Sequence, residues 1–194
     1  ALGGESEPWT PIGNAGNAFK GTFDGGHHVI SGLSISESKG KNVGFFGSVE
    51  GGTVENLTVK GSVSGQSNVA GLVGSLKNGT VMNCANNADV TGVSAVGGVV
   101  GYVGGASVIR QCYNSGTVSG TQGYIGGVTG QHWQAGEVQD CYNVGIVKGP
   151  ATVGGISGGH KASSPVLANC YNAGEIIDST GNSNNIGAVI GASK

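Results

Sequence analysis

Four cysteines are the residues of this chain whose type and spacing first suggest chemistry. Cys84, Cys112, Cys141 and Cys170 recur at nearly constant intervals, and their sequence numbers step by 28, 29 and 29. Thiolates bind zinc, but zinc sites use Cys and His ligands at short local spacing, and no two of these cysteines are close neighbours in the sequence. A disulfide framework stays open, because cysteines in adjacent copies of a stacked repeat can lie within bonding reach and oxidising compartments favour disulfides.

The residues around each cysteine are also repeated, and their parity predicts which side chains face the interior. A strand alternates its faces, so the cysteine and the residues two, four and six positions after it should share one face. Those three positions hold an asparagine, a small residue and an aliphatic residue in all four copies, and the asparagines are Asn86, Asn114, Asn143 and Asn172. We expect an inward ladder of amides that bond one another and free backbone groups at a turn. Ligand binding by these asparagines is the alternative.

Tyrosines follow three of the cysteines and should face outward. Tyr113, Tyr142 and Tyr171 are therefore expected to stack beside the cysteine column. Stacked surface tyrosines could bind a sugar ring, which makes them the candidate ligand-binding residues, but stacking on one another is the simpler interpretation. The aliphatic residue three positions before each cysteine has the opposite parity. A bend or bulge is thus expected near the polar residue that precedes the cysteine.

Two histidines share a position in neighbouring repeats. His132 and His160 each lie seven positions after the aliphatic residue that opens a glycine-rich motif, Ile125 or Val153, so they should stack in the same loop. Imidazole is a common metal ligand, but no third ligand is placed to join the pair. A solvated loop is the preferred interpretation over a metal site, and no cofactor is expected.

Carboxylates are the remaining candidates for catalysis, because parallel β-helices also include polysaccharide lyases and hydrolases. Such enzymes need two carboxylates, or an acid with a base, on one face. Asp89 and Glu175 share a column but lie three coils apart, roughly 14 Å at the spacing of paired strands. Glu137 and Asp140 are close in the sequence but are split by the expected bend. The sequence therefore predicts no catalytic residues and no enzyme in this segment.

All of these side chains belong to a repeat of about 28 residues, which must position them. Many repeat proteins have structural units of about this length. A glycine-rich motif lies roughly half a repeat before each cysteine, and its copies open at Val43, Val69, Val96, Ile125, Val153 and Ile186. The repeat holds short apolar runs and no helix-length pattern, so each copy should form one coil of two or three strands. We predict an all-β fold, a right-handed parallel β-solenoid (β-helix) of about 6–7 coils.

Two coils before the first cysteine indicate what its column does. Leu57 precedes Cys84 by one repeat, and Leu33 precedes Leu57 by slightly less than a repeat, so both leucines are assigned to the cysteine column. A column that accepts Leu or Cys is a buried apolar column, in which free Cys behaves as a small hydrophobe. Buried free thiols are therefore preferred over disulfides.

The composition excludes several classes of protein. The chain has 194 residues, 41 glycines, 10% charged residues and a formal net charge of −2. Abundant Val and Ile with little charge argue against disorder. No basic patch points to nucleic acid, and no apolar run is long enough to predict membrane insertion.

The repeat resembles the GLUG family, named for a Gly-Leu-any-Gly pattern that Gly71-Leu72-Val73-Gly74 fits literally. The other copies keep the glycines and vary the apolar residue, so the resemblance runs through residues 43–194. The stretches 9–13 and 19–27 are similar to the coil that leads into such repeats in bacterial surface proteins. This resemblance implies a large secreted or wall-attached bacterial protein, such as an adhesin or the non-catalytic region of an immunoglobulin A protease, and carries over no catalytic residues.

We therefore expect a non-enzymatic structural or interaction module, an adhesin-like rod or presenting scaffold of a secreted or cell-surface bacterial protein. The alternative is a carbohydrate-binding or polysaccharide-active β-helix that uses the tyrosines. The expected partners are host glycans or surface proteins and neighbouring domains of the same polypeptide. We expect residues 1–194 to form a single solenoid domain of a larger protein, with leading coils over 1–42, repeats over 43–185 and the start of a further coil over 186–194. The last coil should be covered by continuing chain or by another molecule.

Overall fold

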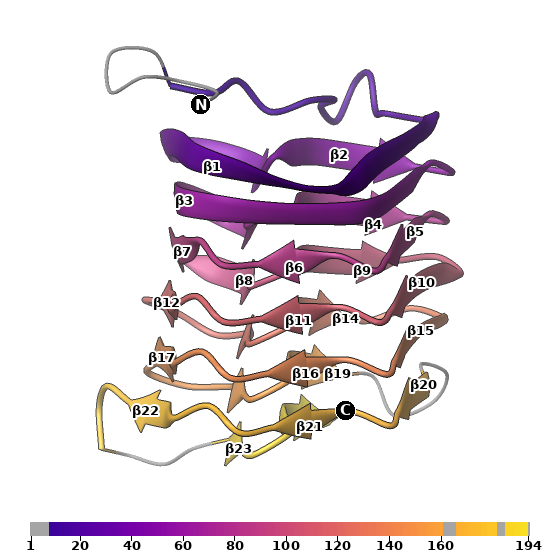
Figure 1. Cartoon of the computed structure of the whole chain (residues 1–194). Coiled ribbons are helices and arrows are strands. Elements are labelled where there is room, and N and C mark those ends of the chain that lie inside the picture. The colour runs from indigo at the N-terminus through magenta and orange to yellow at the C-terminus, as the bar shows by residue number, and fades with distance from the viewer. Residues whose placement is uncertain (1–7, 161–165, 182–184, 194) are drawn as a thin grey trace.

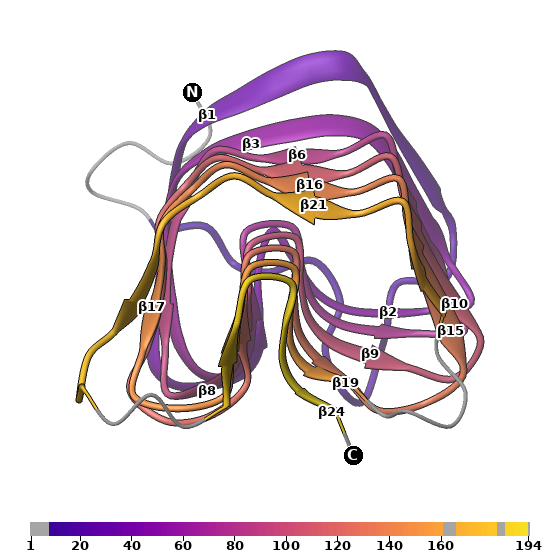
Figure 2. The same cartoon turned by 90° about the horizontal axis from the view of Figure 1, so that it is seen from below.

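The chain folds into a right-handed parallel β-solenoid, as the repeat predicts. The computed structural model describes residues 8–160, 166–181 and 185–193, and these form strands and turns without a helix. In Figure 1 the chain crosses the near face from right to left while it descends, from β10 (Ser107–Arg110) to β11 (Tyr113–Asn114) and β12 (Val118–Gly120). Figure 2 shows the same coils superimposed along the axis.

Two parallel sheets make up the wall of the solenoid. An 18-stranded sheet contains β1 (Thr22–Val43), β3 (Thr53–Ala70), β5 (Thr80–Met82), β6 (Ala85–Asn86), β7 (Asp89–Gly92), β8 (Ser94–Gly97), β10, β11, β12, β13 (Ile125–Gly126), β15 (Gly136–Gln139), β16 (Tyr142–Asn143), β17 (Val147–Gly149), β18 (Val153–Gly154), β20 (Val166–Ala168), β21 (Tyr171–Asn172), β22 (Ile176–Asp178) and β23 (Ile186–Gly187). A 6-stranded sheet contains β2 (Phe46–Glu50), β4 (Val73–Lys77), β9 (Val100–Gly104), β14 (Thr129–His132), β19 (Ser157–His160) and β24 (Ile190–Ser193).

The number of coils and the number of strands in each differ from expectation. Six stacked strands in the smaller sheet correspond to about five turns, where six to seven coils were expected. The described residues before β1 do not complete a coil, because they pair with the next one only through isolated bridges such as Ile12–Phe46 and Phe19–Val49. A middle coil, from β10 to β14, has five short strands rather than two or three. The chain bends more often than the apolar runs indicate.

The glycine-rich motif folds into the centre of the solenoid. Figure 2 shows each coil turning inward between the strands of β8 and β9 and those stacked on them, so that the tip approaches the opposite wall. Gly98 lies at this tip, and a Cβ atom added there would stand 2.5 Å from Cγ of Asn114 and closer still to the carbonyl oxygen of Gly127. The motif therefore needs glycine because a side chain of the opposite wall occupies the space that a Cβ would take.

Aliphatic columns fill the rest of the interior, and aromatic side chains fill its first coils. Val81, Ile109 and Val138, three positions before successive cysteines, are fully buried, as the bend expected before each cysteine allows. At the amino-terminal end, Trp9 stacks on Phe45 with ring centroids 4.8 Å apart and donates its indole N–H to the carbonyl oxygen of Phe45 at 3.1 Å. Phe45 and Phe46 pack edge to face beneath it.

The register of the leading coils corrects one assignment. Thr58 pairs with Ala85, so Leu57 does lie in the column of Cys84. Leu33 does not lie there, because it pairs with Gly61 and the partner of Leu57 is His28. Register shifts on both sides of this pair, between residues 24 and 28 and between 30 and 33, displace Leu33 by several positions although it stays buried. Spacing alone misses such bulges.

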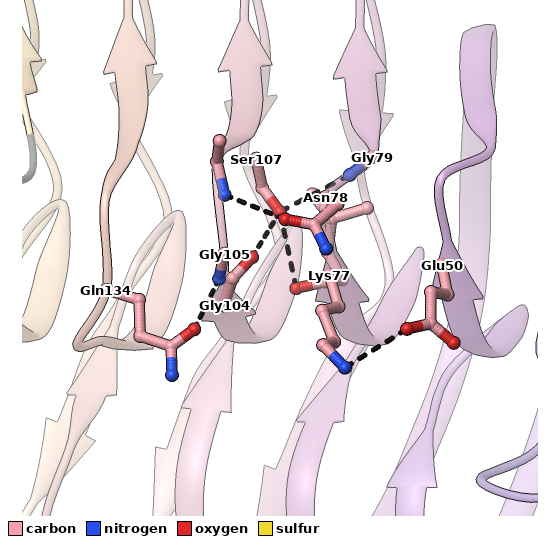
Figure 3. A network of polar contacts seen from close by, with 10 residues as sticks. Glu50, Lys77, Asn78, Gly79, Gly104, Gly105, Ser107 and Gln134 are labelled. Atoms are coloured by element: carbon pink, nitrogen blue, oxygen red, sulfur yellow. Dashed lines mark hydrogen bonds and ion pairs between the residues drawn. The ribbon is translucent and has the colours of Figure 1, made fainter.

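Polar side chains close the corner between the two sheets (Figure 3). Asn78 accepts the backbone N–H of Ala106 at 3.0 Å, Gln134 accepts that of Gly105 at 2.6 Å, and the Ser107 hydroxyl donates to the carbonyl oxygen of Gly104 at 2.6 Å. These bonds satisfy backbone groups where the ladder is interrupted. The network is therefore structural. Within the described ranges, no helix is long and apolar enough to cross a membrane.

Candidate binding face beside the tyrosine column

The chain bends at the residue before each cysteine, and this bend places the residue after the cysteine on the outer surface of the solenoid. Five equivalent residues have positive φ angles between 54° and 57°: Asn56, Asn83, Gln111, Asp140 and Asn169. This left-handed conformation reverses the parity of the strand, which confirms the predicted bend. The cysteine that follows turns inward and the tyrosine after it turns outward. We call these five residues the bend column.

The three tyrosines stack beside the bend column. The ring centroids of Tyr113 and Tyr142 are 5.0 Å apart and those of Tyr142 and Tyr171 are 5.2 Å apart, with planes within 6° of parallel. Tyr171 is 55% exposed, whereas the other two rings are half-buried between neighbours. Burial raises the pKa of the Tyr142 hydroxyl, and the hydroxyls of its two neighbours add to the rise. The column is thus an uncharged aromatic surface of the kind that binds sugar rings.

The four asparagines form an inward ladder, and all but the half-buried Asn172 are closed to a ligand. Asn86, Asn114 and Asn143 are fully buried, and each donates from Nδ2 to Oδ1 of the next asparagine at 2.7 Å. Each amide also donates to the carbonyl oxygen two positions further along, at 2.8 Å. The ladder therefore satisfies backbone groups behind the outer face.

The cysteines lie directly behind the tyrosines as free thiols. Cys84, Cys112 and Cys141 are buried and Cys170 is half-buried. Each thiol donates to the carbonyl oxygen two positions before it at 3.1–3.2 Å, across the bend. Burial raises the pKa of the Cys112 thiol, which disfavours the reactive thiolate. The column fills space and caps a carbonyl group at each bend.

The structure brings the two histidines together but contradicts the expected solvated loop. His132 and His160 pair in register on β14 and β19, with ring centroids 5.2 Å apart and planes at 84°. They are 0% and 7% exposed. Neither ring nitrogen of His132 has a hydrogen-bond partner among the described residues, and no group of three His, Cys, Asp or Glu side chains in that part of the chain could hold a metal ion. Burial, with the nearby His160, lowers the pKa of His132 to about 4.

The acidic residues have partners other than one another. Glu137 forms an ion pair with Arg110 at 3.6 Å, and Asp140 accepts the side-chain amide of Asn169 at 3.0 Å. Asp89 accepts the backbone N–H of Thr117 at 2.9 Å. These contacts give each carboxylate a structural role. None of these three contacts is with a second carboxylate.

A shallow cavity lies at the amino-terminal end of the tyrosine column. It has a volume of about 320 Å³ and is lined by Thr58, Asn83, Cys84, Ala85, Gln111, Tyr113, Asp140 and Tyr142. Sequence reasoning identified Tyr113 and Tyr142 but missed the other lining residues as a site. A signal was present, because the cysteine motif has alanine at position 85 where the later copies have tyrosine.

Comparisons with known proteins agree with this architecture. Residues 92–119 match the family described as the GLUG motif, and they span the inward fold and the next cysteine. The crystal structure of a "putative immunoglobulin A1 protease" from Bacteroides ovatus is similar, with a TM-score of 0.67 and 25% identity over 81% of this chain. The similar region spans 62% of that solved chain. No curated protein matches the chain. The chain is thus a β-solenoid in which one repeat matches the GLUG motif, and its fold is similar to that of a protein described as a "putative immunoglobulin A1 protease".

Proposed function

We propose that this chain is a non-enzymatic structural and interaction module, a rigid rod that presents binding surfaces of a secreted or cell-surface bacterial protein. The observation that carries this proposal is the in-register pairing of consecutive coils from β2 to β24. Each coil buries the edge of its neighbour and shares its core, as in other repeat proteins. Such a rod holds surface side chains at fixed spacing along its length.

The relatives support the proposed location and role. GLUG repeats and the Bacteroides ovatus structure point to surface or secreted proteins, and the similar region is only part of that solved chain. A catalytic part elsewhere in such a protein is compatible with a solenoid that only presents it. The hydrogen-bonded carboxylates and buried thiols described above are what a scaffold requires.

Carbohydrate binding is a second candidate function, and the tyrosine column favours it. Three parallel rings at a spacing of 5.0–5.2 Å form a flat aromatic strip. Cleavage of a polysaccharide is less well supported, because Glu137 is engaged by Arg110 and Asp140 by Asn169. We therefore propose contact with glycans without hydrolysis.

Incubation of the purified chain with immunoglobulin A1 and with a panel of polysaccharides tests the non-enzymatic role. We expect no new protein fragments on a denaturing gel and no new reducing ends. Cleavage that is lost in Glu137→Ala or Asp140→Ala, and kept in the control Glu175→Ala, would overturn the proposal. Cleavage that all three variants retain would point to a contaminant, which a second purification would remove.

A further inference from the structure

We propose that the cavity at the amino-terminal end of the tyrosine column is a binding site for one neutral pyranose ring of a glycan, which would stack on Tyr113. The proposal goes beyond the scaffold function and does not depend on it, because it rests on where two surface columns are interrupted. One is the tyrosine column and the other is the bend column.

The tyrosine column ends with one ring face open. Tyr113 pairs in register with Tyr142 on one side and with Ala85 on the other, and Ala85 pairs in turn with Thr58. Among the described residues, no aromatic ring contacts Tyr113 from the Ala85 side. The cavity of about 320 Å³ reaches Ala85 and Thr58 on this side and extends along the column to Asp140 and Tyr142. A six-membered sugar ring on this face would extend the stack as a fourth ring.

The bend column is interrupted at the same level. On one side Asn83 donates to Asn56 at 2.9 Å, and on the other side Asn169 donates to Asp140 at 3.0 Å. In the described part of the chain, no side-chain hydrogen bond joins Gln111 to Asn83 or to Asp140. Gln111, Asn83 and Asp140 line the cavity. The side-chain amide of Gln111, Oδ1 of Asn83 and one carboxylate oxygen of Asp140 form no side-chain hydrogen bond within the bend column.

Gln111 also has an unfavourable backbone conformation. Its φ angle is 55°, a left-handed value that Asn and Asp adopt several times more readily than residues such as Gln. The other four members of the bend column are Asn or Asp. Gln111 thus has the strained conformation without the short side chain that eases it. Strain of this kind is concentrated at functional sites.

The lining selects a neutral sugar over an aromatic side chain. A pyranose has an apolar C–H face for the ring of Tyr113 and a rim of hydroxyl groups for the amides and Thr58. An aromatic side chain would cover these polar groups without bonding them, which costs free energy. Asp140 is the one carboxylate among the residues that line the cavity, which include no Lys, Arg or His, and Arg110 is held by Glu137 and Gln139. A carboxylated sugar would therefore be repelled.

Saturation-transfer NMR on the full chain tests the site, with lactose, cellobiose and mannobiose as neutral probes and sialylated lactose as the anionic one. We expect at least one neutral disaccharide to receive saturation, with a dissociation constant of about 1–10 mM, as suits a single ring in a shallow site. Sialylated lactose should bind at least tenfold more weakly than lactose does if lactose is a ligand. No transfer to any neutral probe at 50 mM, about five times the weakest expected constant, would overturn the proposal.

Two variants test whether the sugar binds in the cavity beside Tyr113, and a third variant is the matched control. Ala85→Tyr should extend the column into the cavity and weaken binding at least tenfold, with the melting temperature unchanged or raised, because tyrosine occupies this position in three later coils. Tyr113→Ala should abolish binding. Tyr171→Ala, at the far end of the column, should change affinity less than twofold. Equal binding by the wild type, Ala85→Tyr and Tyr113→Ala, or preferential binding of an aromatic peptide, would refute the proposal, while the cleavage assay above would be unaffected.

Discussion

The first coils and the later coils of this solenoid fill the same cross-section in different ways. The first coils hold large apolar side chains, with Phe45 and Phe46 buried beneath Trp9. The later coils hold thiols, a ladder of buried amides and the inward glycine fold. The column of Asn86 begins only at that residue, because its register partner in the preceding coil is Val59. Large apolar side chains fill the interior of the first coils. A repeated interior can include polar groups, because the polar groups of each coil form hydrogen bonds with those of the next.

The inward glycine fold is where the later coils should be easiest to break. Gly98→Ala would force a Cβ atom against Asn114 and the backbone of Gly127. Overpacking costs about 1–3 kcal/mol, and displacing a buried amide from its partners adds about 1–3 kcal/mol. We therefore expect a loss of about 4 kcal/mol in the free energy of unfolding, measured by chemical denaturation.

Gly16→Ala is the matched control, because a Cβ atom there would meet only the Asn14 side chain, at 3.6 Å. It should change the free energy of unfolding by less than about 0.5 kcal/mol. If Gly98→Ala were equally harmless, the inward fold would not be packed as described.

The buried histidines should make the later coils sensitive to acid. The pKa of His132 is lowered to about 4 in the folded state by burial, with the nearby His160 adding to the effect, from an ordinary value of 6.5. Below pH 6.5 the unfolded chain therefore binds a proton that the folded chain does not. Stability should fall as the pH drops from about 6.5 to about 4, by about 3 kcal/mol in total.

Denaturation at several pH values checks this expectation, with His132→Leu as the comparison. Because neither ring nitrogen of His132 has a partner among the described residues, the apolar variant should be about as stable at pH 7. It should also lose most of the dependence on pH. An unchanged pH profile in His132→Leu would assign the acid sensitivity to other groups.

The periodicity of the sequence was enough to predict the fold, because each inward-facing position recurs in several repeats. Cys84, Leu57 and the asparagines could be placed by counting, and the bend before each cysteine followed from a change of parity. Counting failed for Leu33, where register shifts intervene. The coil number was overestimated for a related reason, since residues 8–21 cover the end without completing a turn.

The sequence predicted the columns of repeated side chains, but it was harder to predict that the histidines are buried and that the tyrosine and bend columns are interrupted. From the sequence alone, a histidine in a glycine-rich stretch is expected to be exposed to solvent. The sequence does not show that His132 lies on a strand with its side chain facing inward. The cavity exists because position 85 holds alanine where later coils hold tyrosine, and Gln111 lines the same cavity. These two residues are almost a full repeat apart in the sequence, so only the stacking of coils reveals that they border one site.

The aromatic cover of the first coils should matter less than the inward fold of the later ones. Trp9 is half-buried and contributes one stacked contact and one hydrogen bond. Full truncation of a buried Trp costs about 3–5 kcal/mol, so we expect about 2 kcal/mol for Trp9→Ala. Hydrogen exchange should increase at the amides of β2 before those of β14. A uniform increase along the rod would contradict a local covering role.

The cysteine column should be the most tolerant part of the later coils. Cys112→Val keeps an apolar side chain of similar volume and loses the weak thiol contacts with the carbonyl oxygens of Arg110 and Val81. We expect a cost below about 1.5 kcal/mol by chemical denaturation, as for other volume-conserving changes. Leu57 already occupies this column without a thiol, and its coil is as well buried. A cost of several kcal/mol would mean that the thiols are needed for their hydrogen bonds as well as their bulk, and that the first and later coils differ at this column too.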